Sequence, residues 1–243
     1  MRVFKHLRSD WFRYGFETLA VIVGILSAFA LENWRDTQRV KEEEHEILVN
    51  LLNDLRIAEQ QSITFLDQEN ALREYLILAL NQKSSYDSLS QAFYSDSIFY
   101  NMIWQLEMDV PIIHSYSDIM NTGKSGLITN EQTRQRFTNL EFSISNLRNQ
   151  IYDRLRVQLL RIDEIFVHDL NYVRMISLRY PEISTDSEME NDYQSILNIQ
   201  RIRNLIAIKL NLTHEVINYR KALDEEIQSL ISLLEEELSS HDI

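Results

Sequence analysis

Glycine, proline and cysteine are the residues that this chain has least of. In 243 residues there are four glycines, two prolines and no cysteine, whereas average usage gives roughly 29 glycines and prolines together. Tight turns depend on these two residues, so their scarcity disfavours β-sandwiches, barrels and glycine-loop nucleotide folds, and it favours long helices. The absence of cysteine excludes disulfides and thiolate metal sites.

Positive charge is also in short supply. The chain has 24 lysines and arginines against 37 acidic residues, which gives a formal net charge of -13 at pH 7. A chain this acidic repels nucleic acid, so we expect no nucleic-acid partner. Hydrophobic residues make up 44% of the chain, which is enough for a folded core and excludes a fully disordered protein.

A charge-free stretch at residues 18–31 predicts a membrane anchor. This stretch is short for a membrane-spanning helix, but Tyr14 to Trp34 is 21 residues, about 31 Å of helix, which matches the hydrocarbon core of a bilayer. Aromatic residues at both ends suit the two membrane interfaces. We therefore predict a transmembrane helix at 16–34. Two alternatives stay open: a signal peptide cleaved at residues 28–30, which the lack of a helix breaker there disfavours, and a buried helix of a soluble protein.

The anchor divides the chain into a short basic segment at 1–15, the transmembrane helix and a helical bundle at 35–243. Four basic residues precede the anchor and three follow it closely. By the positive-inside rule, this small excess favours a cytoplasmic N-terminus and places most of the chain outside the cytoplasm. The residues counted are Arg2, Lys5, Arg8 and Arg13 before the anchor, and Arg35, Arg39 and Lys41 after it.

One face of the predicted anchor carries small residues at helical spacing. This transmembrane packing face consists of Glu17, Ala20, Gly24, Ala28 and Leu31. A small-xxx-small stripe lets two helices approach closely, so it predicts self-association, with Glu17 as a polar contact within the membrane. The alternative is a chance stripe in an alanine-rich anchor, with Glu17 reaching the interface.

Three stretches without glycine or proline predict long helices, at residues 32–83, 129–178 and 192–238. Apolar residues recur in each at steps of three and four. In the last stretch the steps repeat as three, four, four, an 11-residue period that favours nearly straight or slightly right-handed packing. The stripe there is Leu205, Ile208, Leu212, Val216, Tyr219, Leu223, Ile227, Leu230, Leu234 and Leu238. The predicted fold is all-α: a transmembrane helix that continues into an elongated antiparallel bundle.

Shorter helices are predicted between the first two long ones, at 86–108 and from Pro111 onward, where proline suits a first helical turn. On the first of these, Phe93, Tyr100 and Trp104 share a face. This face is either a surface for a partner or for lipid, or part of the core.

Turn signals separate these short helices from the long helix at 129–178. Gly123 is placed to cap a helix C-terminus, and residues 129–132 fit a capping box opened by Thr129. Gly123-Lys124-Ser125 contains part of a phosphate-loop motif. No upstream glycine or strand completes the motif, so we predict a helix–helix turn there.

No catalytic or metal-ligating pattern stands out. The six histidines are scattered and none lies in an HExxH motif. Glu42 and His45 have the spacing of one di-iron ligand pair, but no second copy exists, so a charged solvent-facing surface is expected instead. We therefore predict no enzymatic activity, no cofactor and no metal.

Two stretches resemble a known family. The first is the anchor, with Glu17, a Val/Ile-rich run that includes Gly24-Ile25-Leu26, and the Asn33-Trp34 pair; the second is residues 116–128, where a glycine-containing turn precedes Leu-Ile. Both resemble a bacterial family of single-pass membrane proteins known as a domain of unknown function, although Phe16 stands where that family has glycine. The resemblance implies a bacterial inner-membrane protein with this architecture and supplies no activity.

Three functional hypotheses remain. The first is a non-enzymatic, membrane-anchored helical protein that self-associates or serves as an accessory subunit of an envelope membrane complex. The second is an extracytoplasmic ligand sensor that signals through a partner, because about 15 residues inside are too few for an output domain. The third is a cytoplasmic-facing effector, such as a toxin or nuclease, with the opposite topology.

Overall fold

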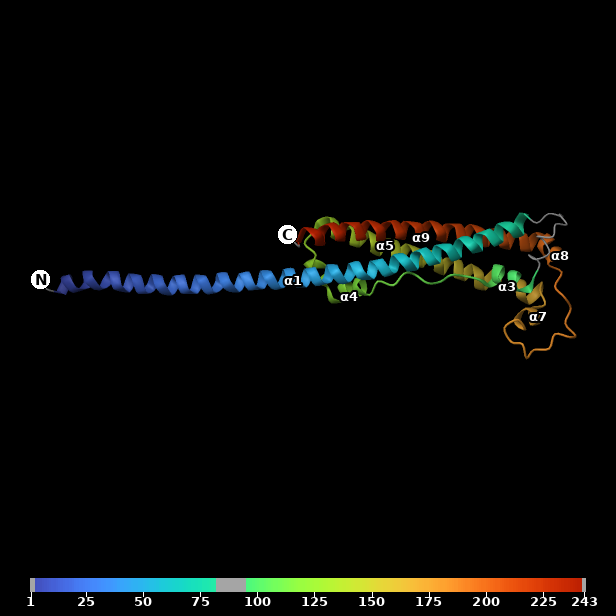
Figure 1. Ribbon diagram of the computed structural model, residues 1–243, viewed down its shortest axis with the longest axis horizontal. Coiled ribbons are helices and arrows are strands. Elements are labelled where there is room, and N and C mark those ends of the chain that lie inside the picture. The colour runs from blue at the N-terminus through green and yellow to red at the C-terminus, as the bar shows by residue number, and fades with distance from the viewer. Residues whose placement is uncertain (1–2, 82–94, 242–243) are drawn as a thin grey trace.

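The computed structural model describes residues 3–81 and 95–241, and all of the regular elements in these ranges are helices (Figure 1). The first helix, α1 (Val3–Asn81), has 79 residues and is therefore about 120 Å long. The other helices are α3 (Asp96–Trp104), α4 (His114–Thr122), η1 (Lys124–Leu127), α5 (Glu131–Val157), η2 (Gln158–Ile162), α6 (Glu164–His168), α7 (Tyr172–Ile176), α8 (Tyr193–Asn198) and α9 (Gln200–His241).

Three long helices, α1, α5 and α9, form an elongated bundle, and the N-terminal part of α1 projects from one end of it (Figure 1). α1 and α5 run away from the projecting segment, and α9 runs back to it. Between α1 and α5 the chain returns through α3, an extended segment at 105–113 and α4. We call residues 105–113 the strap. The predicted fold, an apolar N-terminal helix continuing into an elongated antiparallel bundle, is confirmed.

Most buried residues of the three long helices follow a heptad pattern, with steps that alternate between four and three residues. Leu52 of α1 and Leu205 and Ile217 of α9 are buried beside this series. On α1 the series is Glu44, Leu48, Leu51, Leu55, Ala58, Ser62, Glu69, Leu72, Leu76 and Ala79, with half-buried Phe65 completing it; on α5 it is Thr133, Phe137, Leu140, Ile144, Leu147, Ile151 and Arg154; on α9 it is Ile202, Ile206, Lys209, Thr213, Val216, Arg220, Leu223, Ile227, Leu230, Leu234 and Glu237. A seven-residue repeat keeps one seam of each helix turned to its neighbours and favours left-handed supercoiling.

The 11-residue period predicted for the last helix is therefore wrong. Ile208 and Tyr219, two members of the predicted stripe, are 43% and 37% exposed, whereas their neighbours Lys209 and Arg220 are buried. The prediction counted apolar residues alone. It failed because charged residues fill heptad positions in the middle of the bundle.

The helix predicted at 129–178 is shorter than expected and ends in a π-helix, η2. The buried positions continue through Gln158, while the neighbouring Leu159 is 59% exposed. Past α6 the chain leaves the bundle axis, because the backbone N–H of Asn171 donates to the side chain of Asn191 instead of continuing a helix. Residues 182–188 form a loop, and the helix predicted at 192–238 is α8 and α9, with an interruption at Ile199.

The helix predicted at 86–108 is confirmed only over α3; its remaining described residues, 105–108, belong to the strap. Pro111 does not open a helix, since α4 begins three residues later at His114. Proline cannot donate a backbone hydrogen bond and disfavours helical conformation in the residue before it, which suits an extended segment. Ser84 and Ser85, which separate the helices predicted at 32–83 and 86–108, lie outside the described residues.

The turn between α4 and α5 follows its predicted role in part. Gly123 has φ +69° and accepts the left-handed conformation at the end of α4, as predicted. The N-cap of α5 is Asn130 and not Thr129: its side chain accepts from the backbone N–H groups of Gln132 and Thr133. Thr129 is engaged elsewhere, because its backbone N–H and hydroxyl both donate to Glu44 of α1.

Candidate functional site

The anchor segment of α1 lies outside the bundle. Among its described side chains, those at 15–42 are exposed except for half-buried Gln38. Residues such as Ile22, Leu26 and Phe29 are about half exposed or more, and burying apolar surface is worth about 25 cal/mol per Å². This part of α1 is long and apolar enough to cross a membrane, and none of its apolar window is buried against the bundle.

The predicted packing face remains together on one side of this helix. Ala20, Gly24, Ala28 and Leu31 are all exposed, as is Glu17. A Cβ atom added at Gly24 would meet no atom within 4 Å. The helix continues without a break through residues 28–30, the motif considered for signal cleavage. Nothing in the structure tests whether this face binds a second helix, so that role stays a prediction.

The predicted aromatic surface is only partly described. Phe93 lies outside the described residues. Tyr100 is half-buried and stacks on Trp104 with ring centroids 6.1 Å apart, and Phe166 of α6 meets the Trp104 ring edge-on at 5.6 Å. Trp104 keeps 45% of its surface exposed. These residues therefore join the far end of the bundle, and their binding to a partner or lipid stays a prediction.

A buried ionic cluster occupies the middle of the bundle. Glu69 of α1 is fully buried and accepts two hydrogen bonds from Arg154 of α5, at 2.6 and 2.8 Å from the two guanidinium nitrogens. This bidentate geometry is the strong form of an arginine–carboxylate pair. Arg220 of α9 donates to the same carboxylate at 3.3 Å, and its guanidinium lies 5.2 Å from the ring centroid of Phe65. One carboxylate thus joins the three long helices.

The cations of this cluster also hold the strap. Arg154 donates to the carbonyl oxygen of Glu107, Arg220 to that of Asp109 at 2.9 Å, and Lys209 to that of Gln105 at 2.9 Å. The carbonyl oxygens bound are those of Ile103, Gln105, Glu107 and Asp109. Alternate residues of an extended chain present the same side, so the carbonyls of Gln105, Glu107 and Asp109 on the strap all face the bundle, while Ile103 lies at the end of α3. Side-chain donors replace the helical hydrogen bonds that the strap lacks.

Lys209 is the third cation of the cluster. Its side chain is 1% exposed. Burial, and secondly the charge of Arg154, lower the pKa of Lys209 to about 7, against the opposing effects of Asp163 and Glu69. Burial also lowers the pKa of Arg220, which Glu69 counteracts. Gln158 completes the layer by donating to the carbonyl oxygen of Ile103 and to the carboxylate of Asp163.

A second polar group lies at the end of the bundle from which the anchor projects. Glu44 of α1 and Glu237 of α9 are both buried at the N-terminus of α5. The hydroxyl of Thr133 donates to Glu237 at 2.6 Å, and that of Thr129 donates to Glu44 at 2.8 Å. Negative side chains are favourable at a helix N-terminus, so these bonds fix where α5 begins.

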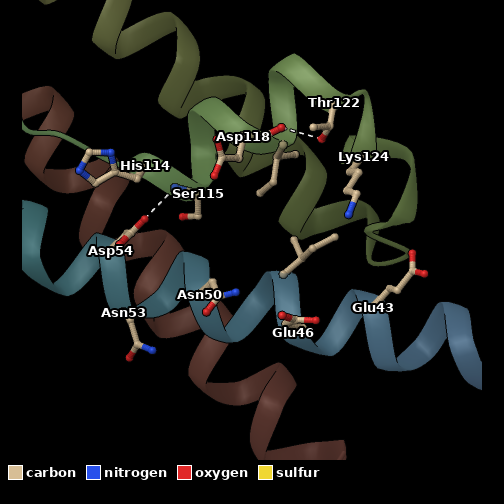
Figure 2. A pocket seen from close by; sticks show the side chains of 12 residues that line it. Glu43, Glu46, Asn50, Asn53, Asp54, His114, Ser115, Asp118, Thr122 and Lys124 are labelled. Atoms are coloured by element: carbon tan, nitrogen blue, oxygen red, sulfur yellow. Dashed lines mark hydrogen bonds between the residues drawn. The ribbon is translucent and has the colours of Figure 1, made fainter.

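An open groove of about 510 Å³ lies beside this end, between α1 and α4. Figure 2 shows the side chains of His114, Ser115 and Asp118 from α4 opposite those of Asp54 and other residues of α1. The backbone N–H of Ser115 donates to Asp54 at 2.7 Å, so Asp54 caps α4 from another helix.

The same groove is negatively charged. Four carboxylates and one lysine line it, so it disfavours anions. The charged residues are Glu43, Glu46, Asp54, Asp118 and Lys124. Among the described residues, no group of three or more His, Asp or Glu side chains is arranged to hold a metal ion.

The chain matches no protein-family model, no curated protein and no solved structure. The resemblance of the anchor and of residues 116–128 to a family of single-pass membrane proteins therefore stays a prediction. Glu69, Arg154, Lys209 and Arg220 were not among the predicted site residues. A sequence signal for them exists: each falls on the heptad series of its helix, where a charged residue must be buried.

Proposed function

We propose that this chain is a non-enzymatic, membrane-anchored helical protein that acts by self-association or as an accessory subunit of a bacterial envelope membrane complex. The observation that supports this most is the continuity of α1, a single helix that runs through the exposed apolar segment and ends in the bundle. Because the helix is uninterrupted, the position of the anchor fixes the position of the bundle. Association through the anchor would therefore bring the bundles of two chains together.

The direction of the small-residue stripe favours this arrangement. Gly24 and Leu51 are 27 residues apart, which is about 7.5 helical turns, so they lie on opposite faces of α1. Leu51 faces the core of the bundle. The stripe around Gly24 therefore faces away from α5 and α9. Two anchors packed through this stripe would place α1 beside α1, with the rest of each bundle on the outside.

We propose that the N-terminus is cytoplasmic and that the bundle lies outside the cytoplasm of a bacterium, anchored in the inner membrane. The excess of basic residues before the anchor supports this orientation. A reporter fused after Ile243 tests it: activity of a periplasmic reporter is expected, and activity of a cytoplasmic reporter alone would contradict the proposal and favour an effector that faces the cytoplasm.

Disulfide cross-linking in native membranes tests self-association. Because the chain has no cysteine, Ala28→Cys and Ala30→Cys each introduce a single thiol. These positions lie about 160° apart around the helix, so Ala30 is the matched control. We expect rapid cross-linking of the Ala28→Cys variant to a dimer and little of Ala30→Cys. Monomers alone for both variants, with no co-purifying partner, would reject both forms of the proposal.

A further inference from the structure

Lys209 occupies a site that suits its neutral form better than its charged form. The amine donates to two main-chain carbonyl oxygens, those of Ile103 and Gln105, and makes no ion pair with any residue in the described part of the chain. A neutral amine has two hydrogens to donate, whereas an ammonium has three. Two acceptors therefore satisfy the neutral amine and leave one N–H of the ammonium without a partner.

The charged groups around Lys209 do not compensate for a further positive charge. Arg154 of α5 and Arg220 of α9 are already present, and both bind Glu69 of α1. Asp163, at the end of η2, is engaged by the side chain of Gln158. On the strap, the carboxylate of Glu107 accepts from the backbone N–H of Asp109. Asp163 and Glu69 favour the ammonium, but burial and the charge of Arg154 outweigh them, so the ammonium would be buried with incomplete compensation.

Movement of the strap would lower the free-energy cost of a positive charge on Lys209. The strap covers the amine through the carbonyl oxygens of Ile103 and Gln105, at the end of α3 and the start of the strap. As an extended segment it has helical hydrogen bonds only at its two ends, from the backbone N–H of Gln105 to Asn101 and from that of Ser117 to Ile113. Opening it would remove the carbonyl oxygen of Gln105 from the amine and admit water to Lys209.

We propose that the strap at 105–113 is a pH-sensitive element, which loosens from the bundle when Lys209 takes up a proton and seats firmly when Lys209 is neutral. This inference does not depend on the proposed function. It assigns a conformational response to pH near neutrality to the middle of the bundle, well away from the anchor.

The sign of the effect follows from linkage. The pKa of Lys209 is about 7 in the folded chain, against 10.5 for a lysine exposed to water. Between these values the unfolded chain binds more protons, so the free energy of unfolding rises with pH across this window. Below about pH 7 the folded chain carries the buried charge and is least stable, and the strap is expected to open most often.

Hydrogen exchange of the full chain in lipid nanodiscs tests the proposal. After correction for intrinsic exchange rates, protection of residues 105–113 is expected to fall about tenfold from pH 8 to pH 6, the change that a single group with a pKa of about 7 produces. Residues between Phe137 and Ile151 of α5, which exchange only when the bundle opens, should stay better protected than the strap at both pH values. Unchanged protection of the strap between the two pH values, or protection of the strap equal to that of α5, would overturn the proposal.

Two variants separate Lys209 from other titrating groups. In the Lys209→Met variant, the hydrogen-exchange protection of the strap should not depend on pH, whether it is higher or lower than in the wild-type chain. Lys221→Met removes an exposed lysine of the same helix and should leave the pH profile unchanged. A wild-type profile in the Lys209→Met variant would overturn the assignment.

If the Lys209→Met variant does not fold, the proposal can still be tested on the wild-type chain. The ¹³Cε resonance of Lys209 should titrate with the same midpoint as the protection of the strap. Titration of this resonance only above pH 9 would contradict the proposal.

Discussion

The bundle has two apolar cores separated by a polar layer, and all three use the same heptad positions. Leu51, Leu140 and Leu230 belong to the core nearer the anchor, and Leu72 and Ile206 belong to the core at the far end. Between them the equivalent positions are held by Glu69, Arg154, Lys209 and Arg220, with equally complete burial. A residue at a heptad position is buried whether it is apolar or charged. Its side chain then determines whether it packs against the other long helices or also binds the strap.

The apolar cores and the polar layer make different contacts. The apolar residues pack α1, α5 and α9 against one another and gain from the removal of apolar surface from water. The polar layer also joins the three helices, but its cations hold the strap through main-chain carbonyl oxygens. A buried ion pair contributes little net stability compared with apolar residues of similar size, yet breaking it is costly. Substitutions in the two layers should therefore differ in a predictable order.

The largest effect is expected for Glu69→Leu. This change leaves the buried guanidinium groups of Arg154 and Arg220 without their carboxylate, so the free energy of unfolding should fall by about 4 kcal/mol. Urea unfolding of the full chain in detergent, followed by circular dichroism, measures it. Glu74→Leu, at an exposed position of the same helix, is the control. Equal loss in both variants would mean that the ionic cluster does not matter for stability.

Leu230→Ala tests the apolar core in the same way. Leu230 is fully buried, and its truncation should lower the free energy of unfolding by about 3 kcal/mol through lost transfer energy and a residual cavity. The same substitution at Leu160, which is 66% exposed, should have little effect. Protection of the strap should remain pH-dependent in the Leu230→Ala variant, since the polar layer is intact. A pH-independent strap in this variant would contradict the separation of the two layers.

The smallest effect is expected for Arg56→Ala. Arg56 and Glu235 form an ion pair of 2.7 Å between α1 and α9, with both side chains about half exposed. Exposed pairs are screened by solvent, so the loss should be about 0.3 kcal/mol at low salt and should vanish near 1 M NaCl. A loss above about 1 kcal/mol that persists in high salt would show that ionic contacts in this bundle are stabilising irrespective of burial.

Much of the fold was predictable from local sequence signals. Long stretches without glycine or proline predicted the long helices, and Gly123 ended α4 as expected. The predicted boundaries failed where a distant residue takes over a local role. Glu44 binds Thr129 and leaves the cap of α5 to Asn130. Asp54 caps α4 from α1, and Asn191 ends the helical path at Asn171.

The candidate sites divide in the same way. The anchor face around Gly24 was found from spacing alone, because a single helix needs no tertiary contact to place residues on one face. The ionic cluster was missed, because the helical stripes were built from apolar residues alone. Including Glu69, Arg154 and Arg220 in the apolar series would have given the heptad, but not the partners of these side chains.

By itself, the sequence determined an all-helical chain with an apolar segment near its N-terminus, because glycine, proline and hydrophobic spacing act locally. The tertiary structure alone decided the strap. Residues 105–108 are extended although the sequence predicted helix there. The buried side chains that bind the carbonyl oxygens of the strap come from α5 and α9, about 50 to 100 residues further along the chain. Where a backbone finds its hydrogen bonds in distant side chains, no local pattern predicts its conformation.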